Sequence, residues 1–107
     1  MVVDDDKDFL YLIQQTLGKE ADFDVCSLCS SKKGALPAAL TDSPDLVLMD
    51  LNLESTWMDG VETARAIRIE TNARIIILTS FDQQEIILDA CRRAFASGYG
   101  LKNKFPM

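Results

Sequence analysis

Apolar residues recur with two different periods along the 107-residue chain. Short continuous apolar runs, such as residues 46–49 and 75–78, are typical of strands that are buried on both faces of a sheet. Other segments, such as residues 9–17, carry apolar residues three or four positions apart, which favours amphipathic helices. The pattern predicts strands at residues 1–3, 25–29, 45–50, 75–78 and 98–101, and helices at about 9–17, 32–41, 60–70 and 82–95.

The predicted elements alternate between strand and helix from one end of the chain to the other. This order implies one domain with a parallel sheet and with helices on both faces of that sheet. Gly18 is expected to end the first helix. Pro37 is expected to distort or restart the second helix, because proline cannot donate a backbone hydrogen bond.

Composition and charge narrow the function classes. Hydrophobic residues make up 48% of the chain and charged residues 26%, which are ordinary values for a globular protein. No apolar run is long enough to cross a membrane, and the first residues lack the features of a signal peptide, so we expect a cytoplasmic protein without membrane contacts. The net charge of -6 argues against direct nucleic-acid binding by this segment, because phosphate contacts need clustered Lys and Arg.

Cys26 and Cys29 have the spacing of a redox or zinc pair. A zinc site needs further ligands, but the chain has no His and only one more cysteine, Cys91. An alternating strand would also place Cys26 and Cys29 on opposite faces of a sheet. We therefore expect buried free thiols rather than a metal or redox site.

Polar residues follow the predicted strands, and in parallel sheets ligands bind beyond the carboxyl ends of the strands. The residues at these ends are Asp4 and Asp5, with Asp6 as a further candidate, after the first strand, Asp50 at the end of the third, Thr79 and Ser80 after the fourth, and Lys102 after the fifth. Each of them alone is more often a helix cap or a solvated side chain. Because acids, a hydroxyl and a lysine follow successive strands of one predicted sheet, we expect them to form a single site together.

The chemistry of these residues indicates phosphoryl transfer. Close carboxylates repel one another, and a hard divalent cation such as Mg²⁺, with Mn²⁺ as a substitute, relieves that repulsion. A carboxylate can also act as a nucleophile and form an acyl phosphate. Mg²⁺, Lys102 and Thr79 would neutralise the phosphoryl oxygens during transfer to Asp50.

Five segments together resemble the response regulator receiver family of two-component signalling, in its chemotaxis-regulator-like form. They are residues 2–6, 46–52, 58–60, 76–80 and 96–102. The resemblance covers nearly the whole chain. It implies an α/β, flavodoxin-like fold with a doubly wound, five-stranded parallel sheet of strand order 2-1-3-4-5.

The resemblance also implies which residues form the phosphorylation and metal sites. Asp50 matches the aspartate that is phosphorylated. Asp4 and Asp5 match an acidic pair that binds Mg²⁺, with Asp5 favoured as the direct ligand. Asn52 sits where a backbone carbonyl completes the metal site.

Three further residues match the parts of the family that respond to phosphorylation. Thr79 matches the switch hydroxyl that turns toward the phosphoryl group, and Lys102 matches the lysine that pairs with that group. Tyr99 matches the aromatic side chain that changes rotamer with Thr79. A packed core ring with a satisfied hydroxyl is the other interpretation of Tyr99.

The chain departs from the family pattern in three places. The loop at residues 51–59 is longer than usual and lacks proline. Asn103 stands where proline usually follows the lysine, and Lys104 is a competing candidate for the role given to Lys102. The chain ends at Met107, where the family continues into a fifth helix, so we expect residues 1–107 to be a receiver domain truncated at the C-terminus, with apolar surface left exposed.

The resemblance implies a regulator that catalyses only its own phosphorylation and dephosphorylation. Because the chain has no His, the expected donor is a separate sensor histidine kinase or phosphotransfer protein. Phosphorylation is expected to bias an existing equilibrium between two conformations. A homodimer is the expected activated form, and DNA would be contacted only through a separate output domain, as in a transcriptional regulator.

Two alternative functions stay open. A haloacid-dehalogenase-like phosphatase also places a nucleophilic Asp after an apolar strand, but it needs a second acid two residues later, where this chain has Asn52. It also usually needs a cap domain, for which the chain has no room. The other alternative is a receiver that serves only as a docking module, and the intact set of Asp5, Asp50, Thr79 and Lys102 argues against it.

Overall fold

The computed structural model describes residues 1–51, 53, 57–80 and 83–102, although the side chain of Trp57 lies outside this description. Strands and helices alternate as the sequence pattern predicts. The elements are β1 (Val2–Val3), α1 (Lys7–Leu17), β2 (Leu28–Cys29), α2 (Lys32–Asp42), β3 (Leu46–Asp50), α3 (Trp57–Glu70), β4 (Arg74–Thr79), α4 (Gln84–Ala94) and β5 (Gly98–Leu101).

The five strands form one parallel sheet in the order β2-β1-β3-β4-β5, which confirms the fold predicted from the resemblance. The order reverses between β1 and β3, so the two strands that carry the predicted acids are direct neighbours. Val3 pairs with Met49 in this register. The residues that follow β1 and end β3 are therefore brought to the same edge of the sheet.

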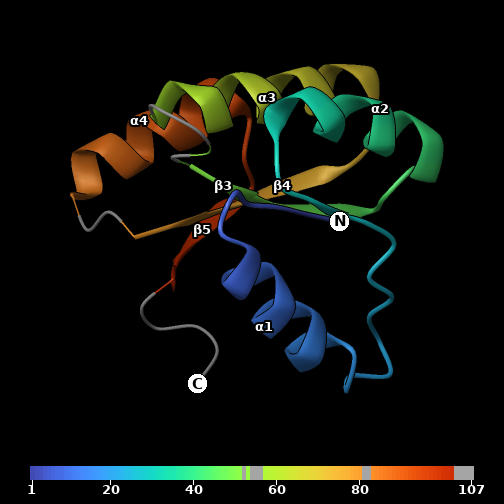
Figure 1. Cartoon of the computed structure of the whole chain (residues 1–107). Coiled ribbons are helices and arrows are strands. Elements are labelled where there is room, and N and C mark those ends of the chain that lie inside the picture. Colours follow the sequence, from blue (N-terminus) through green and yellow to red (C-terminus); the bar gives the residue numbers. More distant parts are fainter. Residues whose placement is uncertain (52, 54–56, 81–82, 103–107) are drawn as a thin grey trace.

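Helix α1 covers one face of the sheet, and α2, α3 and α4 cover the other face (Figure 1). Apolar residues of α1 and of the facing strands form one buried cluster, made of Val2, Phe9, Leu10, Ile13 and Leu78. The larger cluster lies on the opposite face, where Val47, Met49, Ile75 and Ile77 of the central strands contact α2, α3 and α4. The continuous apolar runs in the sequence arise because β3 and β4 are buried from both sides.

The ends of α1 and α2 follow from local side-chain chemistry. Asp6 caps α1, because its Oδ1 accepts hydrogen bonds from the backbone N–H groups of Asp8 at 3.0 Å and Phe9 at 3.2 Å. Ser31 caps α2 through a 3.3 Å bond from the N–H of Gly34. Gly18 ends α1 as predicted, with its N–H bonded to the carbonyl of Gln14.

The structure corrects one predicted strand in the first half of the chain and decides one of the two outcomes expected at Pro37. Strand β2 spans only Leu28–Cys29 rather than residues 25–29, because its partner β1 offers only Val2 and Val3 for pairing. Helix α2 continues through Pro37 from Lys32 to Asp42 and does not restart. The proline removes one donor, but the buried Ala35 and Ala39 on either side of it keep the helix packed in the core.

The three cysteines are free, as expected, but they are not all buried. Cys26 is exposed because it precedes the short β2, while Cys29 and Cys91 are half-buried. Within the described residues, no cysteine belongs to a group of three or more ligands that could hold a metal ion. None of the described helices has the length and apolar character needed to span a membrane.

Candidate functional site

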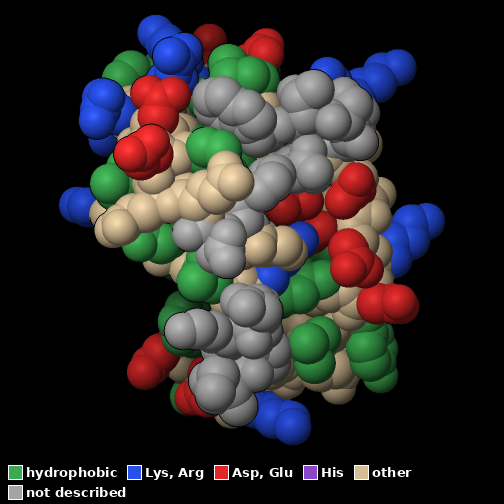
Figure 2. All heavy atoms as spheres, turned by 90° about the vertical axis from the view of Figure 1, so that its left-hand side faces the viewer, with side chains coloured by type: hydrophobic (Ala, Val, Ile, Leu, Met, Phe, Trp, Pro, Cys, Tyr) green, Lys and Arg blue, Asp and Glu red, His purple; other side chains and the backbone are tan. Residues whose placement is uncertain are grey.

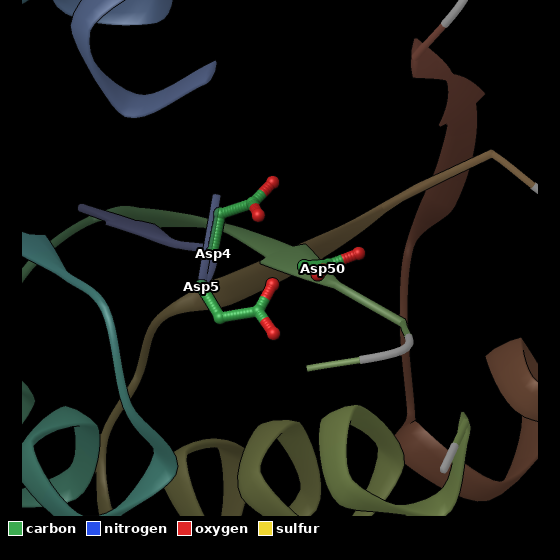
Figure 3. Close-up of side chains that lie close together, drawn as sticks. All are labelled: Asp4, Asp5 and Asp50. Atoms are coloured by element: carbon green, nitrogen blue, oxygen red, sulfur yellow. The ribbon is translucent and has the colours of Figure 1, made fainter. Parts of the chain in front are cut away.

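Three carboxylates meet at the carboxyl edge of the sheet. Asp4 and Asp5 follow β1, and Asp50 is the last residue of β3. One carboxylate oxygen from each lies within 4.8 Å of the others. Asp4 and Asp5 leave the strand on opposite sides, as alternating residues do, and both lie beside the side chain of Asp50 (Figure 3).

Backbone contacts hold Asp4 and Asp50 in place. The Oδ1 atom of Asp4 accepts a hydrogen bond of 2.9 Å from the N–H of Asp6, the residue that caps α1. Asp50 pairs with Leu78 across the sheet, and the next residue, Leu51, donates its N–H to the Leu78 carbonyl at 3.1 Å. Asp4 is 1% exposed and Asp50 is 5% exposed, whereas Asp5 faces solvent.

Lys102 supplies a cation to this cluster. Its Nζ atom lies 2.5 Å from Oδ2 of Asp4 and 3.3 Å from Oδ1 of Asp50. The residue directly follows β5, so the end of the fifth strand is tied to the ends of the first and third. Figure 2, which looks onto the left-hand side of Figure 1, shows acidic and basic side chains next to each other near the centre of the view.

Burial and crowding change the proton affinity of these groups. Burial, followed by the negative charge of Asp4, raises the pKa of Asp50 from 3.8 to about 6, although Lys102 acts in the opposite direction. Burial and Asp4 also raise the pKa of Asp5. Burial alone would lower the pKa of Lys102, but its hydrogen bond to Asp4 and the charges of Asp50 and Asp4 raise it above 10.5.

Gly60 in α3 lies directly against the backbone that carries Asp50. A Cβ atom at this position would lie 2.2 Å from the carbonyl oxygen of Asp50 and 2.4 Å from that of Leu51. The N–H of Gly60 donates to the Leu51 carbonyl at 3.2 Å. Only glycine allows this approach, so the first turn of α3 packs directly against the end of β3.

The structure places the predicted switch residues in different environments. Thr79 ends β4, one residue beyond the partner of Asp50, and is 1% exposed. Tyr99 lies on β5 opposite Ile77 and is 41% exposed, so the interpretation of its side chain as a packed core ring is wrong. Asn52 and the alternative lysine, Lys104, lie outside the described residues.

Two contacts near the site were not predicted from the sequence. The Nζ atom of Lys102 lies over the ring of Phe9, 4.8 Å from its centroid. Lys32, at the start of α2, forms a 2.9 Å ion pair with Asp59 of α3. The apolar periodicity of α1 identifies Phe9 as a core residue, but no sequence pattern signals that its ring faces a lysine from the other end of the chain.

The donor set fits a divalent metal ion. Three carboxylates whose oxygens approach one another this closely carry more negative charge than Lys102 alone neutralises. Carboxylate oxygens are hard ligands that suit Mg²⁺. Asp50 adds a buried carboxylate that can act as a nucleophile next to such an ion.

These features agree with the family to which the chain belongs. The model of the response regulator receiver domain family matches residues 1–103. The chain is therefore a response regulator receiver domain. Receiver domains bind Mg²⁺ at a cluster of aspartates, and Asp4, Asp5 and Asp50 form such a cluster here.

Curated relatives share this domain but differ in the rest of their length. The chain is 32% identical over 106 residues, which are 99% of it, to a protein from Methanospirillum hungatei described as protein-glutamate methylesterase/protein-glutamine glutaminase 2. It is 35% identical over 95 residues, or 88% of its length, to a nitrate/nitrite response regulator protein homolog from Haemophilus influenzae. The chain spans only 30% and 44% of these two proteins.

Solved structures show the same architecture. A two-component response regulator of the LuxR family from Aurantimonas superposes with a TM-score of 0.87 at 30% identity. The match covers 99% of this chain and 74% of the other. Membership in the receiver family favours the regulator interpretation over a haloacid-dehalogenase-like phosphatase.

Proposed function

We propose that this chain accepts a phosphoryl group on Asp50 in a Mg²⁺-dependent reaction and passes the signal on through a change of conformation. The observation that carries this proposal is the environment of Asp50. Asp50 is 5% exposed at the end of a central strand, and its carboxylate lies beside a second buried acid and a lysine. Such a carboxylate is held in one orientation and is shielded from bulk water.

The transfer step uses Asp50 as the nucleophile. One of its carboxylate oxygens attacks the phosphorus of a phosphohistidine, so that a P–O bond forms as the P–N bond breaks. The electron pair of the broken bond stays on the imidazole nitrogen, which then takes up a proton from solvent. Because this chain has no His, the phosphohistidine belongs to a separate sensor histidine kinase or phosphotransfer protein.

Asp4, Asp5 and Asp50 would hold the metal, with the backbone carbonyl of Asn52 as a further ligand. When bound, Mg²⁺ would neutralise charge on the carboxylates and on the phosphoryl oxygens. Lys102 contributes the fixed positive charge of the chain itself, 3.3 Å from the Asp50 oxygen. It can pair with a phosphoryl oxygen on Asp50 because its ammonium carries three donors.

The phosphorylated state is read through Thr79 and Tyr99. The hydroxyl of Thr79 turns toward the phosphoryl group and Tyr99 changes rotamer, which biases the equilibrium between two conformations. A homodimer forms in the activated state, and a separate output domain contacts DNA in a cytoplasmic transcriptional regulator. The regulators named among the relatives support such an output.

Intact mass measurement tests the phosphorylation site. Wild type, Asp50→Asn and Asp45→Asn would each be incubated with Mg²⁺ and phosphoramidate. Asp45 is the matched control, because it is an acid next to the other end of the same strand and is exposed. We expect wild type and Asp45→Asn to gain one phosphoryl group and Asp50→Asn to gain none.

The other outcomes separate the competing functions. Equal gain in Asp50→Asn would show that another residue is the acceptor. No gain in any protein, with the fold confirmed by circular dichroism, would favour a docking module that works without phosphorylation. Sustained release of inorganic phosphate over many turnovers would instead support a phosphatase.

A further inference from the structure

The ammonium of Lys102 contacts an aromatic ring as well as two carboxylates. It lies over Phe9 at 4.8 Å from the ring centroid, while its side chain is 14% exposed. Phe9 belongs to α1 and is 8% exposed. The negative face of an aromatic ring attracts a cation, and the attraction strengthens where water is excluded. The Lys102 ammonium and the Phe9 ring are both largely buried, so their cation–π attraction is stronger than it would be at an exposed site.

We propose that Phe9 is a positioning residue, whose ring holds the Lys102 ammonium in the place that phosphoryl transfer to Asp50 requires. This inference rests on the proposed function. A lysine side chain has a flexible four-carbon stem and can take many rotamers. The two carboxylates contact its ammonium unequally, at 2.5 Å from Asp4 and 3.3 Å from Asp50, so Asp4 draws it away from the residue that is phosphorylated. The ring confines it from the α1 side.

An uncharged ring is suited to this task for an electrostatic reason. A carboxylate in place of the ring would also hold the ammonium, but it would add negative charge to the cluster of Asp4, Asp5 and Asp50 and would compete with the phosphoryl oxygens. The ring attracts the cation without becoming an alternative ion-pair partner. Lys102 therefore stays available to the phosphoryl group.

The ring itself is fixed by the same segment that carries Asp4. Oδ1 of Asp4 accepts from the N–H of Asp6 at 2.9 Å, and Oδ1 of Asp6 accepts from the N–H of Phe9 at 3.2 Å. The side chain of Phe9 also belongs to the apolar cluster between α1 and the sheet. The ring and Asp4 are thus linked by one short hydrogen-bonded segment beside the lysine.

Fluorination of the ring tests the inference with little change of shape. Phe9 would be replaced by phenylalanine carrying one, two or three ring fluorines, which progressively weaken the negative face. We expect the initial rate of Asp50 phosphorylation by phosphoramidate in Mg²⁺ to fall stepwise, by roughly threefold to tenfold at three fluorines. The melting temperature is expected to stay nearly constant. Phe9→Leu should lower the rate at least as much.

A control and a second measurement distinguish positioning from packing. Ile13→Val removes one methyl group from the same apolar cluster and should lower the melting temperature while keeping the rate. Proton NMR of the metal-free, unphosphorylated protein should show side-chain protons of Lys102 shifted upfield by the ring. The shift should disappear in Phe9→Leu.

The outcomes that overturn the inference differ from those that overturn the proposed function. A wild type that is phosphorylated, with a rate that does not depend on fluorination, would overturn the role of Phe9 alone. A rate loss in Ile13→Val as large as that in the trifluoro variant would do the same, because the rate would then follow packing. A wild type that is not phosphorylated would overturn the proposed function and this role with it.

Discussion

Acidic residues gather at both ends of the central strand β3, and the two groups differ in burial and in partners. At the carboxyl end, Asp4 and Asp50 are 1% and 5% exposed, and both lie within ion-pair distance of Lys102. At the amino end, an open cavity of about 550 Å³ is lined by apolar side chains and by exposed acids. Its four aspartates are Asp22, Asp24, Asp42 and Asp45.

The difference shows that acidic composition alone does not make a reactive site. The exposed aspartates at the amino end are hydrated, and water screens their repulsion. The buried pair at the carboxyl end has lost its water, so each charge strongly affects its neighbours, and the pKa of Asp50 rises to about 6. Two buried carboxylates that share one lysine therefore distinguish the candidate site from the exposed acids at the amino end.

The largest expected effect on stability comes from a methyl group placed against the buried carboxyl end of β3. Gly60→Ala would put a Cβ atom 2.2 Å from the Asp50 carbonyl oxygen, and backbone must move to accept it. We expect a loss of roughly 2 to 4 kcal/mol in the free energy of unfolding, measured by urea denaturation. Phosphorylation of Asp50 should slow as well, because the end of β3 would be displaced.

Gly34→Ala is the matched control for this change. Its Cβ would meet only the Ser31 hydroxyl, at an ordinary 3.6 Å, and alanine is the better helix former. This variant should be at least as stable as wild type. Equal stability of Gly60→Ala and wild type would show that the end of β3 is not rigidly held.

The next effect depends on pH and comes from the charge on Asp50. This carboxyl group has a higher pKa in the folded protein than in the unfolded chain. As pH rises from about 4 to about 6, the unfolded chain loses the proton while the folded protein still holds it. The free energy of unfolding therefore falls over this pH range. With the pKa of Asp50 at about 6 rather than 3.8, Asp50→Asn should stabilise the metal-free protein by about 3 kcal/mol near pH 8. The advantage should fade on acidification and vanish below about pH 4.

Thermal or urea denaturation across that pH range measures the effect. Asp45→Asn, next to the exposed end of the same strand, should change stability by no more than about 0.5 kcal/mol at any pH. A stability difference between Asp50→Asn and wild type that stays constant from pH 4 to pH 8 would contradict a raised pKa at Asp50.

The smallest of these effects is stabilisation by the metal. Mg²⁺ at ten times its dissociation constant should stabilise the folded protein by about 1.4 kcal/mol, which thermal denaturation detects as a higher melting temperature. Asp5→Asn removes the exposed carboxylate of the cluster at the carboxyl end of the sheet. It should reduce the stabilisation by Mg²⁺ with little change in the metal-free stability. Asp22→Asn, at the amino end, should keep the full gain. If Asp22→Asn instead lost the stabilisation by Mg²⁺, the metal would bind at the amino end of β3 and not at Asp4, Asp5 and Asp50.

Much of the fold could be predicted because periodicity reports burial directly. The apolar runs at residues 46–49 and 75–78 became the central strands β3 and β4, and the predicted helices match α1 to α4 within a few residues. The sequence was least informative where long-range partners decide the outcome. Strand β2 is short because β1 is short, and α2 passes through Pro37 because the core on both sides of it is packed.

The sequence by itself determined which residues stand at the strand ends, because the alternation of elements and the position of each acid, hydroxyl and lysine are local properties. Only the tertiary structure decided which of those acids are buried and what they contact. The pKa of Asp50, the close approach of Gly60 and the position of the Phe9 ring over Lys102 all depend on segments that are distant in the chain. Charge and packing energies depend on distance and solvent exposure, and the order of residues does not specify either one.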